Sequence, residues 1–113
     1  MAVERLEVPI AKAEYLLRNA ADAGKGGDKR KFWHEILGFE HPESVREAIL
    51  AEVAPNTLKA LPPNAYGQRY QAIISITGPT GRVRLVRTIW IVRSGEVIAR
   101  FVTAVPHSRR KGI

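Results

Sequence analysis

The chain has 113 residues, with 18 lysines and arginines against 11 acidic residues, and it contains no cysteine. This length supports one modest hydrophobic core and excludes a second domain of ordinary size. The absence of cysteine excludes disulfides and thiolate metal sites, while the formal net charge of +7 makes polyanions and acidic proteins the first partner classes to test.

The first half of the chain is predicted to be helical. Pro9 stands at the favoured first turn of a helix, and apolar residues recur at helical spacing behind it. A second short helix is expected from Asp28 to Leu37, because Asp28 suits an N-cap and an apolar stripe follows it. A third helix is expected to begin at Pro42, so the helical half is placed at residues 9–54.

The second half is predicted to be a sheet. Three prolines exclude a regular helix or a central strand from the crossing segment 55–67. After it the period of the apolar residues changes to two, and short turns separate the apolar runs. The strands are expected at residues 68–77, 82–93 and 96–105. The run Leu6 to Val8 is a candidate for an additional edge strand.

These elements predict an α+β fold in a single domain, residues 1–113. Two to three N-terminal helices are expected to pack on one face of a C-terminal antiparallel meander of three to four strands. The sheet half spans 68–105, and a basic tail follows at 106–113. The N-terminus lacks the charge pattern of a signal peptide, so we expect a cytoplasmic protein with no membrane partner.

The turns predict which side of the sheet stays open. If Thr77 lies opposite Arg82, the aliphatic strand residues share the helix-covered face, with Arg87 and Arg100 as its only cations. The opposite face is then polar and basic with two exposed aromatic rings. It collects Arg69, Gln71, Ser75, Thr77, Arg82, Arg84, Thr88, Thr103, Trp90 and Phe101. A one-residue bulge would exchange Arg87 for its neighbours.

Such a face resembles an RNA-binding surface, and it offers groups for cleavage without a metal. That reaction needs cations for the phosphate, hydroxyl donors and a group that transfers protons. The predicted catalytic residues are Arg87, Thr88, Thr103, His34 and His107. The predicted nucleic-acid-binding residues are Arg69, Arg82, Arg84, Trp90, Lys29 and Arg30. No metal or cofactor is expected, because the chain has no HExxH or GxGxxG motif and no Cys/His cluster.

Structural interpretations of the same residues stay open at this point. They are ion pairs from Arg87 and Arg100 to Glu47 or Glu52, ordinary strand positions for Thr88 and Thr103, and packing of Trp90 against Phe101.

The segments KRKFWHEILGF, GPTGRVRLVRTIWIV and ARFVTAVP resemble a small bacterial family catalogued as a domain of unknown function. The resemblance covers Val8 to Pro106, and its most specific pieces are PTGR, RTIW and FVTAVP. In layout that family is similar to the ribonuclease-toxin superfamily of barnase, colicin tRNases and RelE (BECR), whose catalysis occurs on an open sheet face. Members of the small family often end in TAYP, and Val105 replaces that tyrosine here.

The resemblance implies a toxin that acts on RNA and is encoded beside a small acidic antitoxin or immunity protein. It also implies that Arg87, Thr88 and Thr103 occupy matched motif positions. The sequence therefore favours a metal-independent ribonuclease-type toxin with a basic open face. The alternative is a non-catalytic interaction module that binds an acidic protein partner or nucleic acid.

Overall fold

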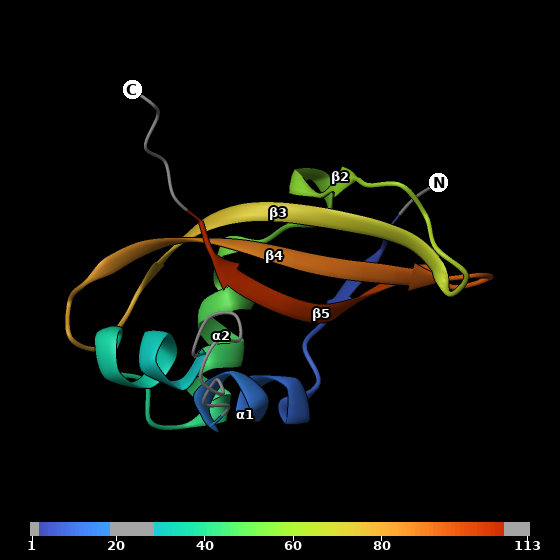
Figure 1. Cartoon of the computed structure of the whole chain (residues 1–113). Coiled ribbons are helices and arrows are strands. Elements are labelled where there is room, and N and C mark those ends of the chain that lie inside the picture. Colours follow the sequence, from blue (N-terminus) through green and yellow to red (C-terminus); the bar gives the residue numbers. More distant parts are fainter. Residues whose placement is uncertain (1–2, 19–28, 108–113) are drawn as a thin grey trace, which may run out of the picture.

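The computed structural model describes residues 3–18 and 29–107 as a layer of helices beneath one sheet (Figure 1). The helical layer consists of α1 (Ile10–Arg18), the π-helical η1 (Lys31–Ile36) and α2 (Pro42–Glu52). A short 3-10 helix, η2 (Pro55–Thr57), follows α2. Asp28 and the tail from residue 108 onward lie outside the described residues. No helix within the described ranges is long and apolar enough to cross a membrane.

The sheet has five strands in the order β1-β5-β4-β3-β2. Their bounds are β1 Arg5–Glu7, β2 Lys59–Ala60, β3 Gly67–Thr77, β4 Val83–Arg93 and β5 Ile98–Pro106. The predicted α+β fold is confirmed, and the three long strands lie close to their predicted bounds. Strand β1 is the expected edge strand near Leu6, but it runs parallel to β5, so the sheet is mixed.

The core lies between the helical layer and one face of the sheet. The helices contribute buried residues at helical spacing, which are Ala13, Leu16, Leu17, Phe32, Trp33, Val45 and Ile49. The strands contribute Ala72, Ile74, Ile76, Val86, Trp90, Val92, Ala99, Phe101 and Ala104. All three helical elements lie on the same side of the sheet, and the opposite face carries no helix of this layer (Figure 1).

The predicted register between the two longest strands is wrong by one residue. Thr77 lies opposite Val83, not Arg82. In the turn, the Gly81 N–H donates to the Gly78 carbonyl at 2.9 Å, and Gly81 adopts a φ of +88°. This left-handed glycine after a tight turn adds one residue to the β4 side, as in a G1 bulge. Every side chain of β4 therefore points to the face opposite the predicted one.

The same turn docks on the end of η1. The Thr80 N–H donates to the Leu37 carbonyl at 3.2 Å, and the Thr80 hydroxyl lies 3.1 Å from the carbonyl oxygens of both Ile36 and Leu37. These bonds satisfy carbonyls that a helix end leaves without partners. Gly78 packs so closely that a Cβ atom there would overlap the Leu37 backbone. The sequence GPTG is thus a helix-capping turn.

We expect Gly78→Ala to lower the free energy of unfolding by about 3 kcal/mol, because its new methyl group collides with backbone rather than with a flexible side chain. Urea unfolding monitored by tryptophan fluorescence measures the change. The control is Gly95→Ala, where φ is +84° but nothing lies within 4 Å of the added Cβ. That variant should lose only about 1 kcal/mol from backbone strain. An equal loss in both variants would contradict the docking role of Gly78.

Candidate nucleic-acid interface

Arg87 lies at the centre of the open face, the side of the sheet turned away from the helices. It stands between its register partners, Ile73 of β3 and Val105 of β5. Its Nε group donates a hydrogen bond of 2.6 Å to the Oε1 atom of Gln71. That bond fixes the guanidinium, whose terminal nitrogens form no hydrogen bond within the described residues. They can bind a phosphate group in the forked geometry that arginine favours.

Two more of the predicted catalytic residues flank Val105 on the same face. Thr103 lies two residues before Val105 and His107 two residues after it. The His107 N–H donates to the Leu85 carbonyl at 2.9 Å, so the β4–β5 ladder extends to this residue. Diagonal neighbours across an antiparallel pair lie about 7–8 Å apart. A hydroxyl and an imidazole therefore lie on either side of Arg87.

A bulge in β5 shapes a hollow beside Thr103. The register shifts between Ile89 and Trp90, so the successive residues Val102 and Thr103 both line the open face. The hollow has a volume of about 450 Å3 and is lined by Asn64, Tyr66, Arg69, Ile89, Ile91, Arg93, Val102 and Thr103. Ile89 is only 6% exposed although it lies outside the core cluster beneath the sheet. We conclude that Ile89 forms the apolar floor of this hollow.

A second hollow lies toward the opposite end of the strands. It has a volume of about 370 Å3 and is lined by Ser75, Val83, Arg84, Leu85 and His107. Arg84 and His107 both border this hollow, and Arg69 and Thr103 both line the first one. The predicted place of Arg84 on the open face is nevertheless wrong, because it lies opposite the buried Ile76 and so belongs to the helix side of β4. Neither set of lining residues includes a carboxylate, so both hollows favour anionic ligands.

Thr88 and Trp90 do not lie on the open face, and their predicted exposure is wrong. Both are 0% exposed in the core. The Thr88 hydroxyl donates to the Ala72 carbonyl at 2.7 Å and accepts the Trp90 indole N–H at 2.8 Å. Phe101, also predicted to be exposed, packs edge-on against Trp90 at a centroid distance of 5.4 Å, as the structural interpretation anticipated. The register shift explains the exchange, because large aromatic rings gain most by lying under the helices.

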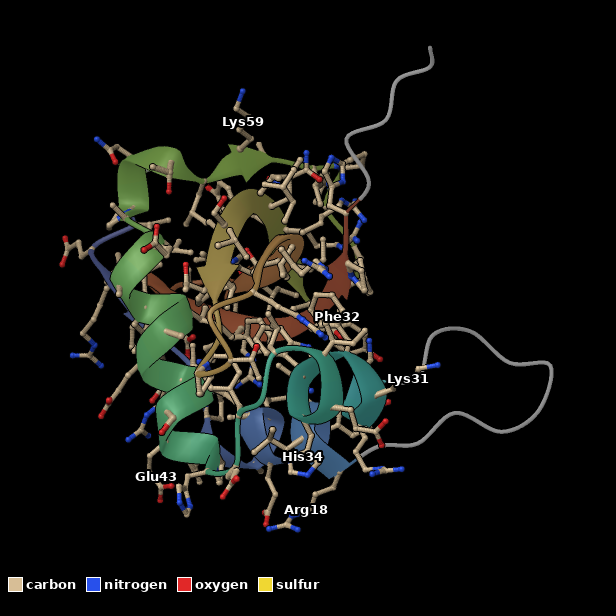
Figure 2. All side chains as sticks on the ribbon, turned by 90° about the vertical axis from the view of Figure 1, so that its left-hand side faces the viewer. Arg18, Lys31, Phe32, His34, Glu43 and Lys59 are labelled. Carbon is tan, nitrogen blue, oxygen red and sulfur yellow. The ribbon has the colours of Figure 1, made fainter. Side chains whose placement is uncertain are left out.

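His34, Lys29 and Arg30 belong to the helical layer. His34 lies beside Arg18 on the side away from Lys59 of β2 (Figure 2), and its Nδ1 atom is 2.7 Å from the Phe39 carbonyl oxygen. The ammonium group of Lys29 donates to the Ala104 carbonyl at 3.2 Å, and burial lowers the pKa of this lysine.

Three further arginines that the sequence analysis singled out lie away from Arg87. Arg30 forms an ion pair with Glu35 at 3.0 Å. Arg100 pairs with Glu7 at 3.2 Å and Glu96 at 3.4 Å rather than with α2, so the expected partners on that helix are wrong for this residue. Arg82 lies exposed in the β3–β4 turn. Its place at the sheet's end separates it from the first hollow.

Sequence reasoning missed Tyr66, Asn64 and Arg93 as site residues. The Asn64 side chain accepts hydrogen bonds from the N–H groups of Tyr66 and Gly67 at 2.8 and 3.2 Å, which fixes a tight turn beside the sheet. An aromatic residue between Asn64 and Gly67 in a proline-rich segment was the available signal. Within the described residues, no group of three or more His, Cys, Asp or Glu side chains is placed to hold a metal ion.

Comparisons with known proteins agree with this architecture. The model of a family described as a domain of unknown function (DUF6883) matches residues 1–108. A chain of the contact-dependent growth inhibition toxin–immunity protein complex from Klebsiella pneumoniae 342 has a similar structure, with a TM-score of 0.62 and 20% sequence identity. The match covers 88% of this chain and 98% of that chain, and at this identity it shows a shared fold. No curated protein matches the sequence.

We expect Thr88→Val to lower the free energy of unfolding by about 2 kcal/mol, because it leaves the buried indole N–H of Trp90 without an acceptor. Thr88→Ser keeps the hydroxyl and is the matched control, with a smaller loss. Thermal unfolding measures both. A Thr88→Val variant as stable as the wild type would contradict the structural role of this hydroxyl.

Proposed function

We propose that this chain, which belongs to the family described as a domain of unknown function (DUF6883), is a metal-independent ribonuclease toxin acting on RNA in the bacterial cytoplasm. The observation that carries the proposal is the placement of Arg87, Thr103 and His107 together on a sheet face without a helical cover. Likeness to a chain of a toxin–immunity complex supports a toxin-like or partner-binding role. The net charge of +7 supports a polyanionic substrate.

The reaction is the attack of a ribose 2′-oxygen on the adjacent phosphorus. The new P–O2′ bond forms as the P–O5′ bond breaks, the 2′-hydroxyl loses its proton and the leaving 5′-oxygen gains one. His107 accepts the first proton, since histidine is a common general base. A water molecule gives the second proton to the 5′-oxygen, and the hydroxide so formed takes the proton from His107, which restores the free imidazole. Arg87 binds the non-bridging oxygens, where negative charge builds up in the transition state. Thr103 donates a hydrogen bond to the same phosphate.

Two positions of the family pattern are assigned differently in this proposal. Thr88 supports the core and takes no part in the reaction. Val105 replaces the tyrosine of the TAYP ending and lies opposite Arg87, between Thr103 and His107. The aliphatic side chain at this position cannot transfer protons, so the proposal gives that role to its neighbour His107.

A second candidate function is partner binding without catalysis. Ile73 is 46% exposed on the open face beside Arg87, and Val83 and Val102 are also exposed there. Apolar groups interleaved with arginines fit a small acidic immunity protein as well as they fit RNA. A toxin would use the same face for both ligands, since an inhibitor that covers Arg87 blocks access to the substrate.

We expect the purified protein to cleave single-stranded RNA at the same rate in buffer and in excess EDTA. Arg87→Ala should lower that rate about 100-fold or more, because it removes the fixed donor for the phosphate charge. Lys12→Ala, which removes an exposed cation of α1, is the matched control and should cleave like the wild type. Intact RNA after incubation with the wild type, or equal cleavage by Arg87→Ala, would refute the ribonuclease proposal.

The two candidate histidines give a second test. We expect His107→Ala to lower the cleavage rate about 100-fold or more, whereas His34→Ala should retain most of the activity. The reason is that His107 lines the open face, while His34 lies on the helical side. Single-turnover cleavage of a labelled RNA measures both rates. The reverse order of effects would place the proton-transfer group in the helical layer and overturn the assignment.

A further inference from the structure

The hollow at the β5 bulge contains features that phosphate binding does not require. Tyr66 is 76% exposed and is the most exposed large hydrophobic side chain among the described residues. Three of its neighbours in the hollow, Ile89, Ile91 and Val102, are aliphatic, and two, Arg69 and Arg93, are cationic. An aromatic ring, an apolar floor and two cations without an acidic partner in residues 3–18 and 29–107 together match the chemistry of a nucleotide, whose base is flat and apolar on its faces.

The turn that carries Tyr66 is held in place. Asn64 and Gly67 form a backbone bridge, with the two N–H···O bonds at 3.0 and 3.3 Å, in addition to the side-chain bonds of Asn64. Gly67 has a φ of +152° and packs against the backbone of Val92 and Arg93, where a Cβ atom would collide. The position of Tyr66 relative to the end of β4 is therefore fixed before any ligand binds, and this lowers the entropy cost of stacking.

The volume and the position of the hollow also suit a nucleotide. Its volume of about 450 Å3 is within the usual range for a small-molecule pocket, roughly 300–1,000 Å3, and exceeds that of a single base. Thr103 belongs both to this hollow and to the cluster around Arg87. The hollow is therefore continuous with that cluster, so a strand of RNA bound with one base on Tyr66 can extend along the face toward Arg87.

We propose that this hollow is a nucleobase pocket, in which Tyr66 stacks on one unpaired base of a single-stranded RNA and Arg69 and Arg93 bind the flanking phosphates. The assignment rests on the proposed action on RNA at the same face. The pocket further requires that the bound nucleotide is not base-paired, because a base inside a duplex cannot enter the hollow. Base identity contributes little, since stacking tolerates every base.

The test measures binding separately from cleavage. The probe is a short fluorescein-labelled oligoribonucleotide of mixed sequence with 2′-O-methyl riboses, which cannot undergo attack by the 2′-oxygen. A second probe has the same backbone but abasic sites in place of the bases. We expect Tyr66→Ala to raise the Kd of the first probe about tenfold or more and to leave that of the abasic probe unchanged. Tyr66→Phe should bind like the wild type, because stacking needs the ring and not the hydroxyl.

Tyr15→Ala is the matched control, since Tyr15 is 50% exposed on α1 in the helical layer. It should bind both probes like the wild type. The pocket is refuted if the wild type does not bind the first probe, if Tyr66→Ala binds it unchanged, or if Tyr66→Ala weakens both probes equally. A wild type that binds through Tyr66 but leaves unmodified RNA intact would refute the ribonuclease proposal and keep the pocket. If the protein cleaves RNA but Tyr66→Ala binds the first probe like the wild type, the pocket is refuted and the ribonuclease proposal stands.

Discussion

The contact between the β3–β4 turn and the end of η1 is the constraint on which the rest of the structure depends. Thr80 supplies both a hydroxyl and an N–H to carbonyls at that end, and Gly78 allows the two backbones to touch. A turn held this way cannot slide, so the register of β4 against β3 is fixed. Because one residue of slippage inverts a strand, the turn geometry set by Gly81 makes Trp90 face the helices and Arg87 face outward, and this contact holds that turn in place.

Two local irregularities then convert a regular sheet into a surface with hollows. The left-handed Gly81 places Arg87 on the open face, and the β5 bulge brings Val102 and Thr103 to that face together. In a flat alternating strand, one of these two neighbours would point into the core. The bulge therefore makes the hollow beside Arg87 without changing the buried pairing of Trp90 with Phe101.

Local patterns were sufficient to predict the elements but not the side of the sheet on which each residue lies. The apolar period changes after residue 67, so the helices and long strands followed from the sequence, and so did Arg69 and Thr103 as open-face residues. Strand β4 is nearly as apolar on one face as on the other, so alternation could not orient it. The deciding factor was the conformation of Gly81, which the letters GPTG leave open. Tyr66 was missed because its place depends on a turn rather than on a period.

The distribution of charge on the molecule connects these structural facts to a ligand. Arg18 and Arg30 of the helical side pair with glutamates at 3.1 and 3.0 Å, and Arg100 at the β5 edge is also paired. Within the described residues, Arg69, Arg87 and Arg93 have no acidic partner, which is also true of Lys12 and Arg46 on the helical side, but only Arg69 and Arg93 border an apolar hollow. Arg69 and Arg93 border the first hollow, whose lining includes no carboxylate, so their mutual repulsion opposes folding. An anionic ligand that also offers flat apolar surface removes that repulsion, and a nucleotide meets both conditions.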